Sequence, residues 1–411
     1  MNQSPTARLA DKAKVLMGQS PPSAVCSETG EGLPFIQGNA EFGRRHPIPI
    51  LRCCAPTRVA EAGDLLVSVR APVGGLNQAV ERTVIGRGLS ALRFEPSQQS
   101  FAWHSVRFAV PGFNRVAQGS TFLAVSREDV ERLEIPWHEE ANPDIAAVLD
   151  TVDEAIANTE AVIAKLRQVR AGLLHDLLTR GLDGHGQLRD PIAHPEQFQD
   201  SALGRIPKEW SCKTLGDAAD WFSGGTPSRS QSAWWNGEVP ILTPKDMKVF
   251  EISDTIEHVT MEAAVAGSKV MPPETAFIVV RGMILAHTFP VCLSTRPFAF
   301  NQDIKAVRGR AELTTRFLAH WFAANASVFL RKTTEATHGT KKLDSKELHR
   351  TPIGVPEPEE QATIVERIEA FDSAIAGDGT EVGKLQQMKS GLMTDLLTGR
   401  VRVPEVLETT Q

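Results

Sequence analysis

The sequence is poor in cysteine and lacks any long hydrophobic run. Its five cysteines, among 411 residues, include no CxxC pair, so neither a disulfide framework nor a recognisable zinc site is expected. The best apolar candidate, residues 275–286, is shorter than the roughly 20 residues of a membrane span and contains Arg281. The N-terminal residues have no apolar core typical of a signal peptide. The composition therefore predicts a cytoplasmic protein with reduced cysteines and no membrane contact.

The sequence motifs of catalysis are also missing. There is no Walker loop (GxxxxGK[ST]) and no metal-binding HExxH pair. Neither Pro-Pro pair, at residues 21–22 and 272–273, stands in the Asn/Asp-Pro-Pro-aromatic context of a DNA amino-methyltransferase. Pro143-Asp144 begins a predicted helix, which argues against a nuclease site. We therefore expect no catalytic residue, no bound metal and no bound cofactor in this chain.

Acidic residues outnumber basic ones, and the formal net charge of −6 argues against a simple basic DNA-binding module. The charges are nevertheless segregated along the chain. Residues 44–115 contain ten basic residues, all arginine, against four acidic ones, and residues 305–350 again contain ten against four. Acidic residues gather instead within 128–160 and 357–372. This pattern predicts positive potential on particular faces of the molecule.

An internal repeat indicates the domain organisation. A shift of 219 positions aligns residues 165–179 (KLRQVRAGLLHDLLT) with residues 384–398 (KLQQMKSGLMTDLLT), with nine of fifteen pairs identical and no gap. Shorter matches link residues 9–11 with 215–217, 18–21 with 224–227, and 126–128 with 345–347. The sequence thus predicts two copies of one unit, each a mixed domain followed by a shared helical segment.

The shared segment is predicted to be a long helix with a heptad seam, because apolar residues alternate at spacings of four and three. The seam residues are Ile145, Leu149, Val152, Ile156, Ile163, Leu166, Leu173 and Leu177 in the first copy, and Ile364, Ile368, Phe371, Ile375, Val382, Leu385, Leu392 and Leu396 in the second. Both copies carry a polar residue at one matching seam position, Thr159 and Asp378. A cation follows at another, Arg170 and Lys389.

These seams predict that the two helices pair with each other, and the alternative is that each helix packs only on its own domain. Residues 142–144 and 358–361 supply proline-containing helix starts. A run of about 34 residues would span roughly 50 Å. Gly377, Gly379 and Gly383 weaken the second helix, each by about 1 kcal/mol relative to alanine, and predict a kink or break near Gly377.

Outside the helices, short apolar runs flanked by glycine and proline predict strands at residues 63–72, 239–243 and 276–281. The fold class is therefore α/β (mixed α+β). The predicted boundaries are a first domain at 1–138, a first spacer helix at 139–181, an exposed linker at 182–203, a second domain at 204–356, a second spacer helix at 357–400 and a C-terminal tail at 401–411.

Several side chains suit contact with nucleic acid. Glycine-rich turns bring backbone N–H groups close to phosphate, arginine can fork onto guanine, and glutamine or asparagine can fork onto adenine. The candidates are Gln37, Asn39, Arg44, Arg45, Arg70, Gln118, Ser120 and Thr121 in the first half, and Ser223, Gly224, Gly225, Thr226, Ser228, Arg229, Lys245, Arg281, Arg331, Lys332, His338, Thr340, Lys341 and Lys342 in the second. Any one of them alone fits a solvated turn equally well. Recurrence in both halves favours DNA binding.

The order of these elements resembles the specificity subunit of type I restriction–modification systems over almost the whole chain. The resemblance is carried by residues 204–210 (GRIPKEW) and 215–217 (LGD), by 224–227 (GGTP) and 358–361 (PEEQ), and by 385–400 with its twin at 172–179. It implies two target-recognition domains and two helical spacers in an antiparallel coiled coil, related by a pseudo-two-fold axis. Each domain would read one part of an asymmetric bipartite site in double-stranded DNA.

The resemblance also implies partners. The spacer helices would set the unread gap and dock two methyltransferase subunits, and restriction/translocase subunits would join that assembly. S-adenosylmethionine, ATP and magnesium are then expected on those partner subunits. Two other functions stay open on the residues alone: a stand-alone restriction or methylation enzyme with fused recognition domains, and a coiled-coil scaffold that does not bind DNA.

Overall fold

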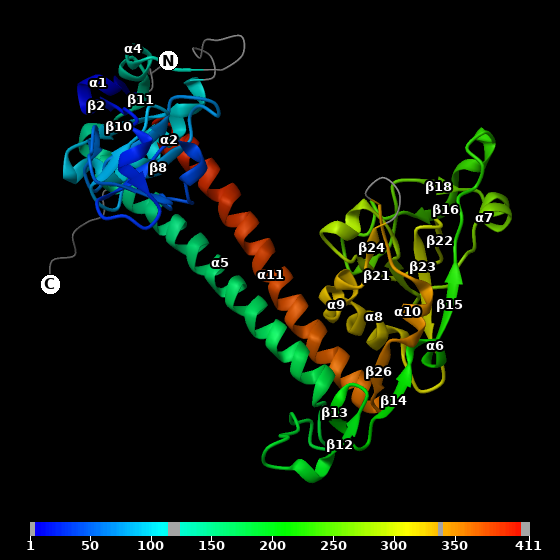
Figure 1. Cartoon of the computed structure of the whole chain (residues 1–411). Coiled ribbons are helices and arrows are strands. Elements are labelled where there is room, and N and C mark those ends of the chain that lie inside the picture. The colour runs from blue at the N-terminus through cyan, green and yellow to red at the C-terminus, as the bar shows by residue number, and fades with distance from the viewer. Residues whose placement is uncertain (1–4, 114–123, 336–339, 404–411) are drawn as a thin grey trace. The chain divides into compact units, whose positions relative to one another are not determined.

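The structure is a computed structural model that describes residues 5–113, 124–335 and 340–403. The chain divides into two compact units. Unit 1 comprises residues 1–162 and 378–411, and unit 2 comprises residues 163–377. Each unit thus contains one α/β domain together with parts of two long helices (Figure 1).

Unit 1 contains two sheets that share a core. A four-stranded antiparallel sheet has the order β2-β10-β7-β8, a five-stranded sheet has the order β3-β5-β4-β9-β6, and β1 pairs with β11. The strands are β1 (Thr6–Arg8), β2 (Lys14–Met17), β3 (Cys26–Ser27), β4 (Leu33–Ile36), β5 (Leu51–Cys53), β6 (Val59–Ala60), β7 (Leu65–Ser68), β8 (Leu76–Gln78), β9 (Thr83–Ile85), β10 (Leu89–Arg93) and β11 (Glu134–Pro136). The helices of its domain are α1 (Leu9–Lys12), α2 (Gln99–Ala109) and α4 (Arg127–Glu131).

Apolar runs place the central strands and α2 in one core. All four residues of β7 are buried, which explains why the predicted strand at 63–72 shows no alternation of apolar and polar residues. Helix α2 buries Phe101 and Trp103 in the same cluster as Leu65 and Val67. The helix therefore covers one face of the four-stranded sheet.

Unit 2 repeats this plan with a longer sheet. Its central sheet has the order β15-β23-β19-β21-β17, and smaller sheets have the orders β18-β16-β22, β20-β25-β24, β14-β26 and β12-β13. The strands are β12 (Phe198–Ser201), β13 (Gly204–Pro207), β14 (Ser211–Thr214), β15 (Ala219–Ser223), β16 (Trp235–Leu242), β17 (Glu251–Ile252), β18 (His258–Val259), β19 (Ala276–Val279), β20 (Arg281–Gly282), β21 (Val291–Ser294), β22 (Ala299–Phe300), β23 (Ile304–Gly309), β24 (Thr334–Glu335), β25 (Lys341–Lys342) and β26 (Pro352–Val355). The helices of its domain are α6 (Leu215–Ala218), α7 (Met261–Gly267), α8 (Thr315–Ala324), α9 (Ala326–Arg331) and α10 (Ser345–Arg350).

The two domains have equivalent topologies. The order β2-β10-β7-β8 in unit 1 corresponds to β15-β23-β19-β21 in unit 2, and both runs are antiparallel throughout. Helix α8 packs on β19, β21 and β23 and follows the last of these strands, as α2 follows β10. The predicted duplication, the predicted α/β class and the strands at 239–243 and 276–281 are confirmed.

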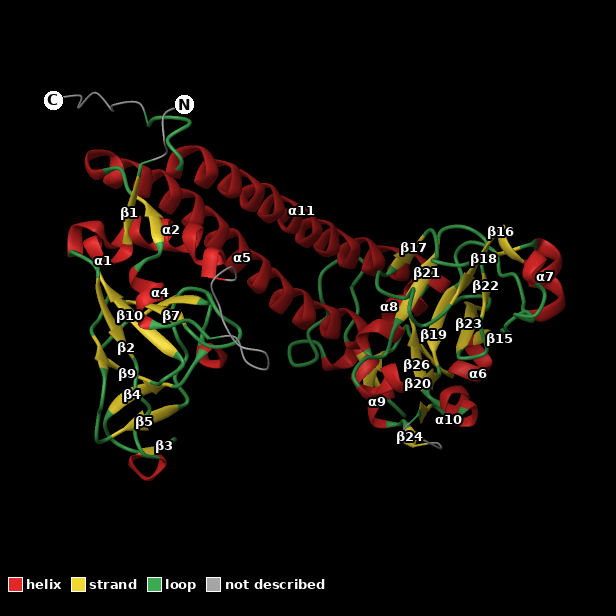
Figure 2. Cartoon of the chain, turned by 90° about the horizontal axis from the view of Figure 1, so that it is seen from above, coloured by secondary structure: helices red, strands yellow, loops and turns green. Residues whose placement is uncertain are grey.

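Two long spacer helices complete the units, α5 (Asn142–Thr179) and α11 (Pro358–Leu397). In unit 1, Ile145 and Leu149 near the start of α5 share a core cluster with Leu396 near the end of α11. In unit 2, Leu177 near the end of α5 shares a cluster with Ile364 near the start of α11. Within each unit the helices therefore run antiparallel and pack on each other as well as on the domain (Figures 1 and 2).

The expected break in the second helix is wrong, because α11 is helical without interruption from Pro358 to Leu397. A Cβ built on Gly377, Gly379 or Gly383 would meet nothing within 4 Å. The lack of a side chain at these positions therefore removes no packing contact. Their cost in helix propensity is local, whereas the two ends of α11 are held in hydrophobic cores.

The expected exposed linker is also wrong in part. Leu182 is 3% exposed and belongs to the core of unit 2. Arg189 is 5% exposed, and its Nη1 donates to Glu360 Oε1 on α11 across 2.8 Å. Trp210 Nε1 donates to the other oxygen of Glu360 across 3.0 Å. This segment therefore fastens the second domain to the start of α11. Over the described parts of the chain, no helix combines the length and hydrophobicity required to cross a lipid bilayer.

Candidate nucleic-acid interface

The glycine-rich turn of the second domain follows β15 and is held against the next strand of the sheet. Lys305 Nζ donates to Ser223 Oγ across 2.6 Å, and Thr226 Oγ1 donates to Gln302 Oε1 across 2.8 Å. A Cβ on Gly224 would lie 2.1 Å from the carbonyl oxygen of Phe300. Only glycine fits this close approach, which fixes the turn beside residues 300–305.

A small basic sheet lies at the same edge. In the sheet β20-β25-β24, Arg281 pairs directly with Lys342 across two antiparallel strands. Arg281 Nε donates to Asp303 Oδ1 across 2.9 Å, which places this sheet against the residues that hold the glycine turn. Lys341 pairs with Glu335, while the side chain of Lys342 is exposed. Asp303 and Glu335 therefore neutralise Arg281 and Lys341, and Lys342 is the exposed cation that could meet an anionic ligand such as phosphate.

The segment Gln302–Lys305 joins these two features, and sequence analysis did not single it out. Gln302 contacts the glycine turn, Asp303 contacts the basic sheet, and Lys305 contacts Ser223. The backbone N–H of Asn301 also donates to Leu242 at the end of β16, three residues before the candidate Lys245. The only sequence signal was the polar run Asn301-Gln302-Asp303 that precedes a strand. We call residues 223–226, 281, 302–305 and 340–342 the second-domain cluster.

Arg229 does not share these contacts and is engaged elsewhere. Its guanidinium makes two hydrogen bonds to Glu257, of 2.6 and 2.7 Å, and its Cζ lies 3.6 Å from the ring centre of Trp235. The hydrogen bond to Glu257 raises the pKa of Arg229, and the same contact lowers the pKa of Glu257, with a smaller effect of Lys245. Ser228 bonds with Ser230 instead. Arg229, Glu257 and Trp235 therefore form a separate set of contacts beside the turn.

The remaining candidates of the second domain fall outside the cluster. Arg331 ends α9 and is exposed, and Lys332 Nζ donates to Thr351 Oγ1 across 3.3 Å. Gly225, by contrast, belongs to the cluster, and a Cβ there would lie 2.4 Å from the carbonyl oxygen of Gly267. Gln118, Ser120, Thr121 and His338 lie outside the described residues.

Two candidates of the first domain, Gln37 and Asn39, line one hollow. Residues 37–41, which follow β4, line it together with Ala71 and Pro72. Asn39 packs on Gly75, where a Cβ would lie 2.0 Å from Asn39 Oδ1. Gln37 and the neighbouring Arg70 are exposed. Two amide side chains, which can read base edges, therefore line this hollow, and Arg70 directly precedes its lining residue Ala71.

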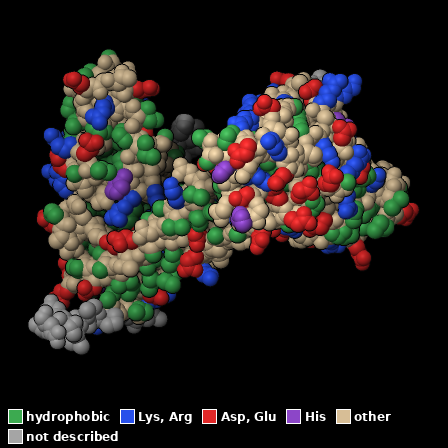
Figure 3. Space-filling model, turned by 90° about the horizontal axis from the view of Figure 1, so that it is seen from below, with side chains coloured by type: hydrophobic (Ala, Val, Ile, Leu, Met, Phe, Trp, Pro, Cys, Tyr) green, Lys and Arg blue, Asp and Glu red, His purple; other side chains and the backbone are tan. Residues whose placement is uncertain are grey.

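Two other arginines of the first domain are held by contacts. Arg44 forms an ion pair with Glu160 on α5. Arg45 Nε donates to Gln78 Oε1 across 3.2 Å, and its Cζ lies 5.1 Å from the ring centre of Trp103. Both are therefore structural contacts in this conformation. On the face shown in Figure 3, Lys and Arg side chains lie among Asp and Glu side chains and do not form one continuous basic patch.

The spacer helices are joined by matched ion pairs. In unit 1, Lys389 Nζ on α11 donates to both oxygens of Asp153 on α5 at 2.6 Å, and burial lowers the pKa of Lys389. In unit 2, Arg170 on α5 donates to Asp372 on α11 across 2.8 Å. All predicted seam residues of both helices are buried or half-buried.

Among the described residues, no group of three or more His, Cys, Asp and Glu is arranged to hold a metal ion.

Comparison with known proteins finds sequence similarity over part of the chain. Residues 207–382 match the family model for the type I restriction modification DNA specificity domain. The chain is 35% identical over 169 residues to the type I restriction enzyme MjaX specificity subunit of Methanocaldococcus jannaschii, covering 40% of this chain and 40% of that protein. It is 34% identical over 178 residues to the EcoR124I/EcoR124II specificity subunit of Escherichia coli, covering 43% and 44%. The matched region thus spans less than half the length of either relative.

Similarity of fold to a solved structure covers almost the whole chain. A crystal structure of the type I restriction–modification S subunit from M. genitalium covers 95% of this chain and 96% of that one, with a TM-score of 0.57 and 16% sequence identity. At this identity the match concerns the fold alone. It includes both α/β domains and both long helices.

Proposed function

We propose that this chain is a specificity subunit of a type I restriction–modification system and that it selects the DNA sequence on which such a system acts. Each α/β domain binds one part of a bipartite site in double-stranded DNA, in the cytoplasm. The paired spacer helices set the length of the gap that neither domain reads. The chain itself carries out no covalent chemistry.

The observation that carries this proposal is the duplicated domain with two different candidate surfaces. The second domain offers the second-domain cluster, with a glycine turn for phosphate and cations beside it. The first offers the hollow lined by Gln37 and Asn39, with the exposed Arg70 adjoining it in sequence. Because equivalent folds present different side chains, the two parts of the target differ in sequence.

The covalent steps are assigned to partner subunits. We propose that two methyltransferase subunits dock on the spacer helices and bring S-adenosylmethionine. Restriction/translocase subunits, which require ATP and magnesium, join that assembly. The curated relatives are named specificity subunits of restriction enzymes, which supports a role in recognition.

The test is to produce this chain together with the methyltransferase subunits of its system and to map methylated positions in the host DNA. A two-part asymmetric motif with a constant gap is expected, and omission of this chain should abolish methylation. Methylation by the purified chain with S-adenosylmethionine alone would make it an enzyme. Absence of any salt-dependent DNA binding would make it a scaffold, because phosphate contacts release counterions.

A further inference from the structure

A buried histidine joins the first domain to its spacer helix. His104 on α2 is fully buried, and its Nε2 lies 2.9 Å from Asp150 Oδ1 on α5. Ser100, one turn earlier on α2, hydrogen-bonds to the same carboxylate. Two side chains of one helix therefore hold one acidic group of the other.

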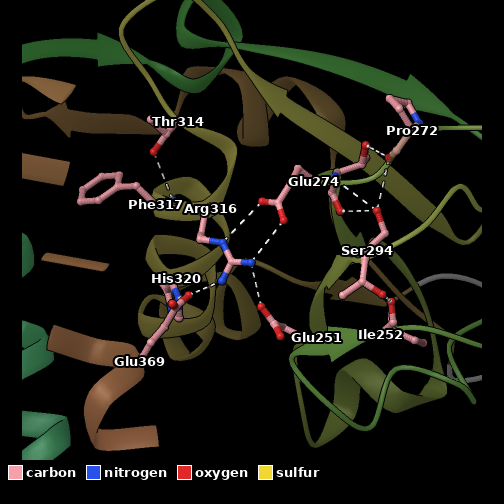
Figure 4. Close-up of polar contacts among 12 residues, drawn as sticks. Glu251, Ile252, Pro272, Glu274, Ser294, Thr314, Arg316, Phe317, His320 and Glu369 are labelled. Carbon is pink, nitrogen blue, oxygen red and sulfur yellow. Dashed lines mark hydrogen bonds and ion pairs between the residues drawn. The ribbon is translucent and has the colours of Figure 1, made fainter. Parts of the chain in front are cut away.

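The second domain has the same contact. His320 on α8 is 2% exposed, and its Nε2 lies 3.2 Å from Glu369 Oε1 on α11. Arg316, one turn earlier on α8, pairs with Glu369 and also with Glu251 and Glu274 (Figure 4). The histidine and the carboxylate thus recur, while the residue one turn before the histidine differs.

The two contacts are equivalent positions of the duplication. His104 and His320 are 216 positions apart, as are Ser100 and Arg316, while Asp150 and Glu369 are 219 apart. The two shifts differ by three because the chain between the histidine and its carboxylate partner is three residues longer in the second copy. A single sequence shift therefore does not align both partners of the contact. In the structure, both histidines lie on the helix that packs on the central sheet, and both contact a carboxylate of the spacer helix.

A second pair of contacts repeats with the same two shifts. Asn142 Nδ2 at the start of α5 donates to Gln98 Oε1 across 2.9 Å. Thr314 N and Oγ1 both donate to Gln361 Oε1 at the start of α11, each across 2.9 Å. Asn142 and Gln361 are both 0% exposed. Each domain helix is therefore tied to its spacer helix at two points about two turns apart.

Polar contacts of this kind fix an orientation that apolar packing leaves adjustable. A hydrogen bond depends on distance and angle, and a buried polar group without a partner costs about 1–3 kcal/mol. Apolar side chains such as Phe101 and Phe317 can repack after a small rotation at lower cost. Two directional contacts therefore determine both the position and the rotation of the domain helix on the spacer helix.

We propose that the contacts His104–Asp150 and His320–Glu369 are matched positioning contacts that set the pose of each recognition domain on its own spacer helix. This inference rests on the proposed function and names the residues that transmit the geometry of the helices to the DNA-reading surfaces. The histidines touch no DNA themselves. They act by keeping each reading surface at a fixed angle to the helix.

The test is methylation by the assembled complex on duplexes that carry the same two half-sites at the preferred gap and at gaps one base pair shorter and longer. H104L/H320L is expected to lower the preference for the correct gap by about tenfold, in the range of couplings between contacting residues. H104Q/H320Q retains an N–H group near the Nε2 position and is expected to restore the preference to within about twofold. H175L, at an exposed position on α5, is the matched control.

Melting temperatures separate positioning from simple loss of stability, and D150N/E369Q serves as a second variant if the leucine variant does not fold. A leucine variant that folds and keeps the full gap preference would overturn the inference, as would a glutamine variant that behaves like leucine. If the wild-type complex shows no gap preference, the proposed function fails instead, and the two failures are distinguished by that first measurement.

Discussion

Arg170 on α5 donates a hydrogen bond to Asp372 on α11 across 2.8 Å, and the duplication repeats this contact with the roles of the helices exchanged. Adding 219 to 170 gives 389, and subtracting 219 from 372 gives 153, which are the numbers of Lys389 and Asp153. Each copy thus contributes one acid and one cation, and each acid meets the cation of the other copy. Only an antiparallel pairing in this register satisfies both pairs.

Loss of one of these cations should destabilise the protein in proportion to its burial. K389M is expected to lower the free energy of unfolding by about 2 kcal/mol, because the side chain of Asp153, 21% exposed, loses its partner. R170M, in the more exposed pair, is expected to cost about half as much. Urea denaturation measures both. K384M, whose lysine is 69% exposed, should change the free energy by less than about 0.5 kcal/mol.

Stability should fall in acid through the histidine contact of the second unit. Burial lowers the pKa of His320 below its ordinary 6.5, with the hydrogen bond that His320 donates to Glu369 offsetting part of that effect. The unfolded state therefore binds the proton more readily, so stability is present above pH 6.5 and is lost as pH falls. We expect urea unfolding to show a decline in the free energy of unfolding between pH 7 and 5 that H320Q lacks and H175Q keeps. An equal decline in H320Q would contradict this assignment.

The carboxylates of both histidine contacts should extend this decline to lower pH. Burial alone would raise the pKa of Glu369, but hydrogen bonds from Arg316 and His320 outweigh it and hold the pKa below 4.5. The hydrogen bonds from His104 and Ser100 likewise hold the pKa of Asp150 below 3.8 despite burial. Their contribution to stability is complete above these values and lost below them.

Glycines in the chain should respond to alanine according to the space around them. G224A is expected to destabilise the second domain by about 1–3 kcal/mol and to weaken DNA binding, because a Cβ would lie 2.1 Å from the carbonyl oxygen of Phe300. G377A should instead stabilise α11 by about 0.5–1 kcal/mol, since its Cβ would meet nothing within 4 Å. Thermal melts of the two variants test both. A destabilised G377A would indicate that α11 is broken there after all.

Removal of an exposed cation from the second-domain cluster should weaken DNA binding without changing sequence preference. K342A is expected to reduce the slope of log affinity against log salt concentration by about 1, as for the loss of one phosphate contact. Fluorescence anisotropy at several salt concentrations measures this slope. K384A, on the exposed surface of α11, is the matched control and should leave the slope unchanged.

The sequence predicted those features that depend on local periodicity or on repetition. The heptad spacing from Ile145 to Leu177 and from Ile364 to Leu396 predicts the two helices, because burial along a helix follows the apolar positions directly. The unbroken apolar run of β7 predicts a buried strand for the same reason. The break near Gly377 was wrongly predicted because propensity is a local term, whereas both ends of α11 are held by distant residues.

Features that depend on long-range pairing could not be predicted. Arg189 meets Glu360 from 171 positions away, so the sequence alone predicts an exposed linker for this segment. Gln302 and Asp303 became part of the second-domain cluster only through contacts with Thr226 and Arg281. The equivalence of the contacts His104–Asp150 and His320–Glu369 could not be predicted, because the two histidines are 216 positions apart and their partners 219. In each case the sequence gives the residue but not its partner.

The length of the spacer helices offers the most direct test of the account. Insertion of one heptad into both α5 and α11 lengthens each by about 10 Å, at 1.5 Å per residue, which corresponds to about three base pairs of duplex. Mapping of methylated sites with the altered chain should then give the same two half-sites separated by a gap about three base pairs longer. Changed half-sites with an unaltered gap would contradict the claim that the paired helices set the spacing.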